Sequence, residues 1–316
     1  MTIQTVTGPI ENNELGFTLI HEHVLVAAGG LWQSHPDLLG PNQEERAIDF
    51  LRRAKADGID SIVDCTTFDL GRAPGLLSLA SEASGVNVIN VTGWWLDVPR
   101  CLQGVGPNQM AREFVRDITE GFRGTDIKPG LLKCAADLEG VTPPLETMTR
   151  AVARAHLETG LSIMAHSYPA GQVGRRQIEI LKEEGVDLTR VKIDHCNDTT
   201  DVEYLEWILD QGCFFGLDRY PGRLVSPKTR TLTLKKLIDL GHADRLCPSH
   251  DCVCLYIHSE RPDGTIPNEH DVHDLWPDQL QFMKRHVIPD LKEMGVSDAT
   301  IHQLFVDNPR RFLTGT

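Results

Sequence analysis

The chain has 316 residues, of which 31 are Lys or Arg and 45 are Asp or Glu, so its formal net charge at pH 7 is −14. This acidic balance argues against a nucleic-acid partner and against an anionic membrane surface, because both require clusters of basic side chains. Hydrophobic residues make up 41% of the chain and charged residues 24%, a composition that is typical of folded proteins and excludes wholesale disorder.

Residues 1–15 lack the basic start and the apolar run of a secretion signal, and no stretch approaches the roughly 18 apolar residues of a membrane helix. The eight cysteines are too sparse for a disulfide scaffold. We therefore expect a cytoplasmic protein with reduced thiols and no membrane partner.

Short apolar, β-branched runs alternate with helical stretches along the chain. Apolar residues at three- and four-residue spacing predict helices, for example over 42–57, 143–159 and 200–211. Eight strands are predicted between such stretches. In chain order they are 16–23, 60–67, 86–93, 130–137, 161–167, 191–198, 213–220 and 245–251.

Eight strand and helix units can form either an open doubly wound sheet or a closed (β/α)8 barrel. No Gly-rich phosphate loop follows the first strand, and chemically capable residues gather at the C-terminal ends of many strands, which favours the closed barrel. We expect a single TIM-barrel domain over residues 1–316. A lid-like loop is expected over about 252–274, followed by two amphipathic helices from Trp276 onward.

Several strand ends carry residues that bind metal ions. His21 and His23 flank Glu22, so the two-residue period of a strand points both imidazoles toward the barrel interior. A hydrogen-bonded polar pair is the alternative for this motif taken alone. The full set of metal-ligand candidates is His21, His23, Lys133, His166, His195 and Asp251.

Lys133 lies inside the apolar run LLKCAA. A buried lysine is costly to ionise, so we expect its pKa to fall and its neutral amine to be able to capture CO₂. The resulting carbamate is an anionic oxygen ligand that can bridge two divalent ions. A snorkelling side chain or an ion pair is the alternative for Lys133 taken alone.

The combination of TLIHEH at 18–23, Lys133, His166, His195, LDRY at 217–220 and His250-Asp251 resembles the phosphotriesterase-like family, including its lactonases, within the amidohydrolase superfamily. The resemblance covers nearly the whole chain. It implies two divalent metal ions, with zinc first and cobalt, manganese or iron as alternatives. By this resemblance His21, His23 and Asp251 hold the more buried ion, His166 and His195 hold the more exposed one, and carboxylated Lys133 bridges both together with a hydroxide.

The resemblance also implies a mechanism. Two cations that share a water lower its pKa, and the exposed cation polarises the carbonyl or phosphoryl oxygen under attack. Asp251 would accept the proton and return it to the leaving group. Asp198 and Arg219 are candidate partners of this step, with a structural salt bridge at the barrel mouth as the alternative. The catalytic candidates are thus Asp251, Lys133, Asp198 and Arg219.

The substrate is less sharply indicated. Trp94 and Trp95 follow the third strand, and neighbours on an extended segment point opposite ways, so we expect one to pack and the other to face substrate. A Trp followed by an apolar residue and Asp97 resembles the organophosphate hydrolases, whereas Arg219 after Asp218 resembles the lactonases. The candidates for substrate contact are Trp94, Trp95, Arg219, Tyr220, Tyr256 and His258.

We therefore expect a metal-dependent hydrolase that opens lactones, with N-acyl-homoserine lactones as candidate substrates and weak phosphotriesterase activity as a side reaction. One alternative is a dedicated organophosphate triesterase, or a carboxylic ester or amide hydrolase, with the same metal centre. Another is a non-catalytic barrel that binds a small molecule. The resemblance further implies a homodimer.

Overall fold

The computed structural model describes residues 2–222, 224–257 and 278–316. Its strands are β1 (Thr2–Thr5), β2 (Gly8–Glu11), β3 (Thr18–Val26), β4 (Ser61–Asp64), β5 (Asn87–Gly93), β6 (Leu131–Ala135), β7 (Ile163–His166), β8 (Val191–Ile193), β9 (Phe214–Leu217), β10 (Leu246–Pro248) and β11 (Val253–Tyr256). Its α-helices are α1 (Leu31–Ser34), α2 (Gln43–Ala56), α3 (Pro74–Ser84), α4 (Pro107–Glu120), α5 (Pro143–Thr159), α6 (Gly174–Glu183), α7 (Val202–Asp210), α8 (Pro227–Asp239), α10 (Ile288–Glu293), α11 (Asp298–His302) and α12 (Asn308–Thr314).

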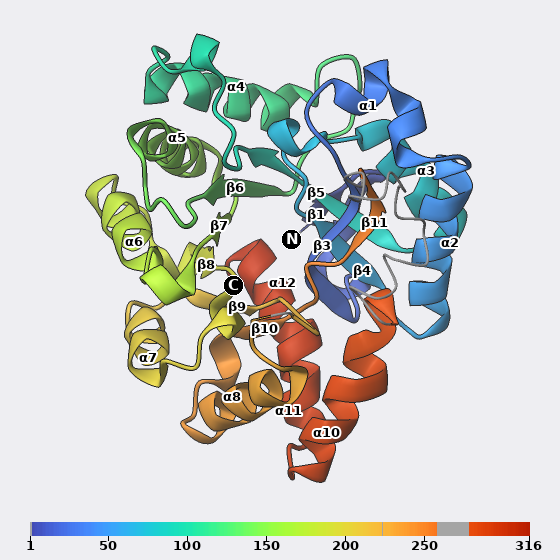
Figure 1. Ribbon diagram of the computed structural model, residues 1–316, viewed down its shortest axis with the longest axis vertical. Coiled ribbons are helices and arrows are strands. Elements are labelled where there is room, and N and C mark those ends of the chain that lie inside the picture. The colour runs from blue at the N-terminus through green and yellow to red at the C-terminus, as the bar shows by residue number, and fades with distance from the viewer. Residues whose placement is uncertain (1, 223, 258–277) are drawn as a thin grey trace, which may run out of the picture.

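The strands β3 to β11 form one parallel sheet in the order β10-β9-β8-β7-β6-β5-β4-β3-β11, and the helices α2 to α8 surround it (Figure 1). The sheet closes through the segment that joins β10 to β11. There the Asp251 N–H donates to the His21 carbonyl at 3.0 Å, and the His23 N–H donates to the Cys252 carbonyl at 2.8 Å. The protein is therefore a TIM-type (β/α)8 barrel.

All eight predicted barrel strands are confirmed, and the predicted helix over 42–57 is α2. The predicted lid is corrected at its start, because residues 253–256 form β11 and pair with β3. Their apolar sequence suits a strand that covers the free edge of β3. The rest of the predicted lid, from residue 258, lies outside the described residues. The N-terminal hairpin of β1 and β2 was not predicted.

One half of the barrel interior is apolar. The N-terminal segment and α12 close this end of the barrel, where Phe312 and Leu313 pack against the strand residues. The cluster consists of Ile3, Leu15, Ile20, Val63, Cys65, Ile89, Val91, Leu131, Met164, Phe214, Cys247, Phe312 and Leu313. The predicted metal ligands lie in the other half, at the C-terminal ends of the strands. Among the ranges that the structure describes, no helix combines the length and apolar character needed to cross a bilayer.

Candidate metal centre

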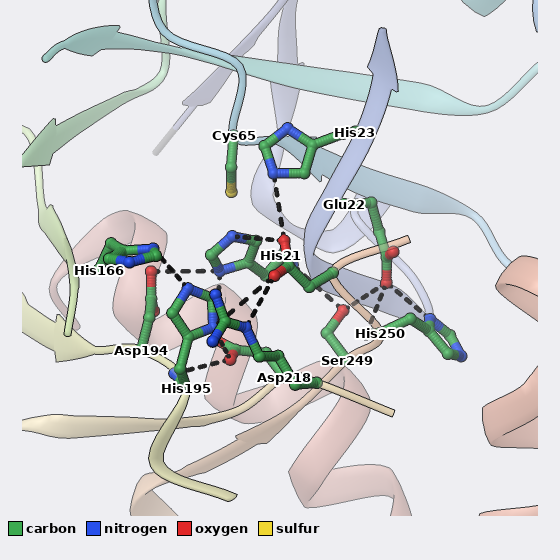
Figure 2. Close-up of polar contacts among 12 residues, drawn as sticks. His21, Glu22, His23, Cys65, His166, Asp194, His195, Asp218, Ser249 and His250 are labelled. Carbon is green, nitrogen blue, oxygen red and sulfur yellow. Dashed lines mark hydrogen bonds and ion pairs between the residues drawn. The ribbon is translucent and has the colours of Figure 1, made fainter. Parts of the chain in front are cut away.

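The structure brings the six predicted metal ligands together inside the barrel, and Figure 2 labels His21, His23, His166 and His195 among them. The Asp251 carboxylate lies 3.2 Å from Nε2 of His23 and 3.4 Å from Nε2 of His21. On the far side, Nδ1 of His166 and Nε2 of His195 are 2.7 Å apart. Nζ of Lys133 lies 3.1 Å from Nε2 of His21. The side chains thus form two groups of donor atoms next to one buried lysine.

A break in the strand pairing helps to aim His21. Ile20 packs in the interior apolar cluster, yet its neighbour His21 also faces the interior and contacts Lys133. The pairing between β3 and β4 shifts register between Leu19 and Glu22, as in a β-bulge. Because a bulge interrupts the two-residue alternation, consecutive side chains can enter the same space.

Within residues 2–222, 224–257 and 278–316, two sets of side chains have the geometry to hold a metal ion. In each set the ligand atoms lie within 4.8 Å of one another: His21, His23 and Asp251 form one, and His21, His195 and Asp218 form the other. Asp218, however, contacts Nδ1 of His21 at 3.2 Å and Nδ1 of His195 at 3.0 Å. A carboxylate in that place orients the imidazoles and leaves their Nε2 atoms for the metal. The first set therefore fits a divalent cation, and Asp218 fits a supporting role.

The other two imidazoles are oriented in the same way. The Thr66 hydroxyl donates to the Leu25 carbonyl at 3.0 Å, so its oxygen accepts from Nδ1 of His23 at 2.8 Å. Asp137 lies 2.9 Å from Nε2 of His166. The His166 hydrogen bond lowers the pKa of Asp137 to about 2, against the opposing effect of its burial. Each imidazole consequently keeps one ring nitrogen directed toward the centre.

A buried charge cluster lies beneath these imidazoles. Nζ of Lys192 contacts Asp194 and lies 2.8 Å from Asp218, and all three side chains are fully buried. Burial acts to lower the pKa of Lys192, but the two carboxylates raise it well above its usual value. Oδ2 of Asp194 lies 3.1 Å from Nδ1 of His21 and 3.8 Å from Nζ of Lys133. A buried carboxylate oxygen beside the imidazoles favours positive charge at this place.

Arg219 joins the two predicted catalytic aspartates at the mouth of the barrel. Its Nε donates to Asp251 at 3.0 Å and its Nη1 donates to Asp198 at 2.7 Å. Arg230 holds the other oxygen of Asp198 at 2.5 Å. Burial raises the pKa of Asp251, but His21, His195, the His23 hydrogen bond and Arg219 together hold it well below its usual value. Asp251 is therefore a carboxylate near neutral pH.

The candidates for substrate contact lie in different places. Nε1 of Trp95 points at Nδ1 of His166 at 3.4 Å, whereas Trp94 is buried and donates to the Asp97 carbonyl at 3.0 Å. Tyr220 is fully buried, with its ring 6.5 Å from that of Phe282. Tyr256 is 39% exposed at the end of β11. His258 lies outside the described residues.

Sequence reasoning did not assign the residues that orient the imidazoles, which are Thr66, Asp137, Lys192, Asp194 and Asp218. One signal was available on β8. There Lys192 and Asp194 alternate with the apolar residues Val191 and Ile193, which is the pattern of polar side chains that share one face of a strand.

A TIM-type barrel that gathers imidazoles, a lysine and a carboxylate at the C-terminal ends of its strands can hold metal ions that activate a water, as metal-dependent hydrolases do. The chain matches the Phosphotriesterase family over residues 1–313 and belongs to that family.

Two relatives and one solved structure show how close the similarity is. The chain is 39% identical to a phosphotriesterase homology protein of Mycobacterium tuberculosis, over 98% of this chain and 96% of the relative. It is 36% identical to an aryldialkylphosphatase of Saccharolobus solfataricus, over 96% of this chain and 97% of the relative. The solved structure of the phosphotriesterase from Mycobacterium tuberculosis superposes with a TM-score of 0.91 at 38% identity, covering 99% of this chain and 98% of that one.

Proposed function

We propose that this protein is a lactonase with a binuclear metal centre, that N-acyl-homoserine lactones are its substrate class, and that phosphotriester hydrolysis is a weaker side reaction. The proposal treats residues 1–316 as one phosphotriesterase-like domain that forms a homodimer. His21, His23 and Asp251 would hold one ion, His166 and His195 the second, and a carboxylated Lys133 would bridge them. When bound, the ions supply an activated water and polarise the carbonyl oxygen of the substrate. Zinc is the first candidate, and cobalt, manganese and iron accept the same donors.

The observation that carries the proposal is the row Asp251, Arg219 and Asp198 at the barrel mouth. Ring opening of a lactone releases an alkoxide, which is a poor leaving group and must be protonated. Hydrolysis of an aryl phosphotriester releases an aryloxide, which is a better leaving group. In this proposal Asp251 would take a proton from the attacking water and return it to the alkoxide. Arg219 holds Asp251 in place and offers a cation to the carboxylate product.

Trp95 supplies apolar surface beside the centre. Its ring is perpendicular to that of His166, at 5.9 Å between centroids. A large aromatic side chain in this place can cover the apolar part of a substrate while its N–H remains close to the polar centre. This arrangement suits a substrate with an apolar acyl group.

A second candidate function is organophosphate triester hydrolysis by the same centre. Its support is the segment Trp95-Leu96-Asp97, which resembles organophosphate hydrolases, together with the relative named aryldialkylphosphatase. Hydrolysis of carboxylic esters or amides is the remaining alternative.

A substrate panel tests the proposal. The metal-loaded protein is assayed with γ-lactones that carry acyl chains, with paraoxon-type triesters and with N-acyl substrates, and each assay is repeated after chelator treatment. We expect kcat/KM for lactones to exceed kcat/KM for the triesters and the N-acyl substrates by at least about tenfold. This ratio is equivalent to about 1.4 kcal/mol in transition-state binding. Chelation should abolish turnover and added zinc or cobalt should restore it. Lactone turnover no faster than in the metal-free sample would contradict the proposal. Sedimentation equilibrium tests the homodimer separately.

A further inference from the structure

Glu22 lies between His21 and His23 on β3, but its side chain points away from these two residues and toward Ser249 and His250 (Figure 2). It is fully buried and meets four hydrogen-bond donors from residues 249–252. Its Oε1 accepts from the Ser249 hydroxyl at 2.7 Å, from the His250 N–H at 3.0 Å and from Nδ1 of His250 at 2.6 Å. Its Oε2 accepts from the Cys252 N–H at 3.0 Å. One carboxylate thus binds three residues of the segment that closes the barrel, Ser249, His250 and Cys252.

Asp251 lies between His250 and Cys252, the two residues whose backbone N–H groups Glu22 binds, and its own N–H has a different acceptor. Its N–H donates to the His21 carbonyl at 3.0 Å, and its φ of 55° lies in the left-handed region. Residues with a Cβ rarely adopt that conformation, and they keep it only where the surrounding structure imposes it. The left-handed turn directs the Asp251 carboxylate back toward Nε2 of His23, at 3.2 Å.

We propose that Glu22 is a positioning residue for the metal centre: by binding the N–H groups of His250 and Cys252, on either side of Asp251, it imposes the turn that places the Asp251 carboxylate beside His21 and His23. This inference rests on the proposed metal centre. We call the hydrogen bonds between Glu22 and residues 249–252 the clamp. His250 extends it, because its Nδ1–H donates to Glu22 and its Nε2 accepts the Met283 N–H at 3.1 Å.

The clamp requires a carboxylate and not an amide. Both Glu22 oxygens accept hydrogen bonds, so in Glu22→Gln the new NH₂ group must face either the Cys252 N–H or the three donors at Oε1. The change of size is small and the loss of bonding is specific. A matched control is Asp117→Asn on α4, since Asp117 is also a buried carboxylate, but it accepts from Thr92 at 2.7 Å and from Arg72 instead.

Two measurements on the full-length protein test the clamp: zinc affinity by competition with a chelator, and amide hydrogen exchange of residues 249–252 in the metal-free protein. For Glu22→Gln we expect zinc binding to weaken by at least about tenfold, the usual effect of losing a group that supports metal ligands. Exchange at His250 and Cys252 should quicken by at least about tenfold, because these amides lose their acceptor. Asp117→Asn should change neither quantity by more than about threefold. A folded Glu22→Gln protein in which either quantity stays at its wild-type value overturns the inference.

Ser249→Ala keeps the test open if Glu22→Gln does not fold. It removes one of the four donors to Glu22 and the acceptor of the His21 N–H at 3.1 Å. We expect a smaller loss of zinc affinity, about threefold to tenfold. Unchanged zinc affinity and unchanged exchange in Ser249→Ala would overturn the inference. Failure of the wild-type chain to bind zinc would instead contradict the proposed function, and the exchange measurement would still decide whether the clamp exists.

Discussion

The two halves of the barrel interior are built from the same strands but are held together in different ways. In the apolar half, side chains such as Ile89 and Leu131 interact by packing, which depends on volume and not on direction. In the polar half, Lys192, Asp218 and the imidazoles interact through directed hydrogen bonds and paired charges. A change of shape in the first half can be absorbed in part, whereas a lost partner in the second leaves a buried polar group unpaired.

The largest expected effect is that of Lys133→Ala. It removes the amine whose carbamate is proposed to bridge the two metal ions, and we expect kcat/KM to fall by about two to three orders of magnitude, the scale of losing one group that stabilises transition-state charge. Metal content, measured on the same sample, should fall as well. Added formate or acetate should restore part of the activity by occupying the vacated place. Full activity without added carboxylate would show that no bridging ligand is needed.

Lys192→Met is expected to have the next largest effect, this time on stability. It leaves Asp194 and Asp218 buried without their shared cation, which should cost about 3–5 kcal/mol in the free energy of unfolding. Urea denaturation of the metal-free protein measures it. The matched control is Lys55→Met, because Lys55 is 43% exposed and pairs with Asp60 at 2.9 Å. That change should cost at most about 1 kcal/mol. Equal losses of unfolding free energy in the two variants would show that the buried charge cluster contributes no more to stability than the exposed ion pair.

Ile89→Val probes the apolar half with the loss of one methylene group. Ile89 is fully buried in the interior cluster, so we expect a loss of about 0.5–1.5 kcal/mol in the free energy of unfolding. Zinc affinity, measured by chelator competition, should stay at its wild-type value because this half holds no proposed ligand. A weaker zinc site in this variant would mean that the two halves are coupled.

The smallest effect is expected for Glu184→Gln, in an ion-pair network on the helices. Glu184 pairs with Arg154 at 2.8 Å and Arg150 at 2.9 Å, and the Arg154 hydrogen bond leads the effects that lower its pKa below 4.5. Because the pKa is lower in the folded state, the contribution to stability is present above the unfolded pKa and disappears as pH falls through the folded one. We expect a loss of at most about 1 kcal/mol at pH 7. Urea titrations should find this difference shrinking below pH 4.5; a difference that grows on acidification would contradict the assignment.

The sequence predicted the structure correctly where a single residue, or a regular spacing of apolar residues, determines a strand, a helix or a ligand position. Apolar runs predicted the eight barrel strands, and the predicted ligands at strand ends, such as His166, lie together because a closed parallel sheet brings those ends to one side. Asp218 was not assigned a role, since its contacts with His21 and His195 join three separate strands and no local pattern specifies them. Local pattern also missed the bulge before Glu22, because that shift belongs to the pairing of two strands.

The most direct test of the central claim is anomalous scattering from crystals of the zinc-loaded protein, at a resolution that shows the Lys133 side chain clearly. The proposed function predicts two anomalous peaks, one among His21, His23 and Asp251 and one beside His166 and His195. Planar density for a carbamate should extend from Nζ of Lys133 and lie between them. A fully metal-loaded crystal with an unmodified Lys133, or with its zinc bound away from these side chains, would contradict the proposal.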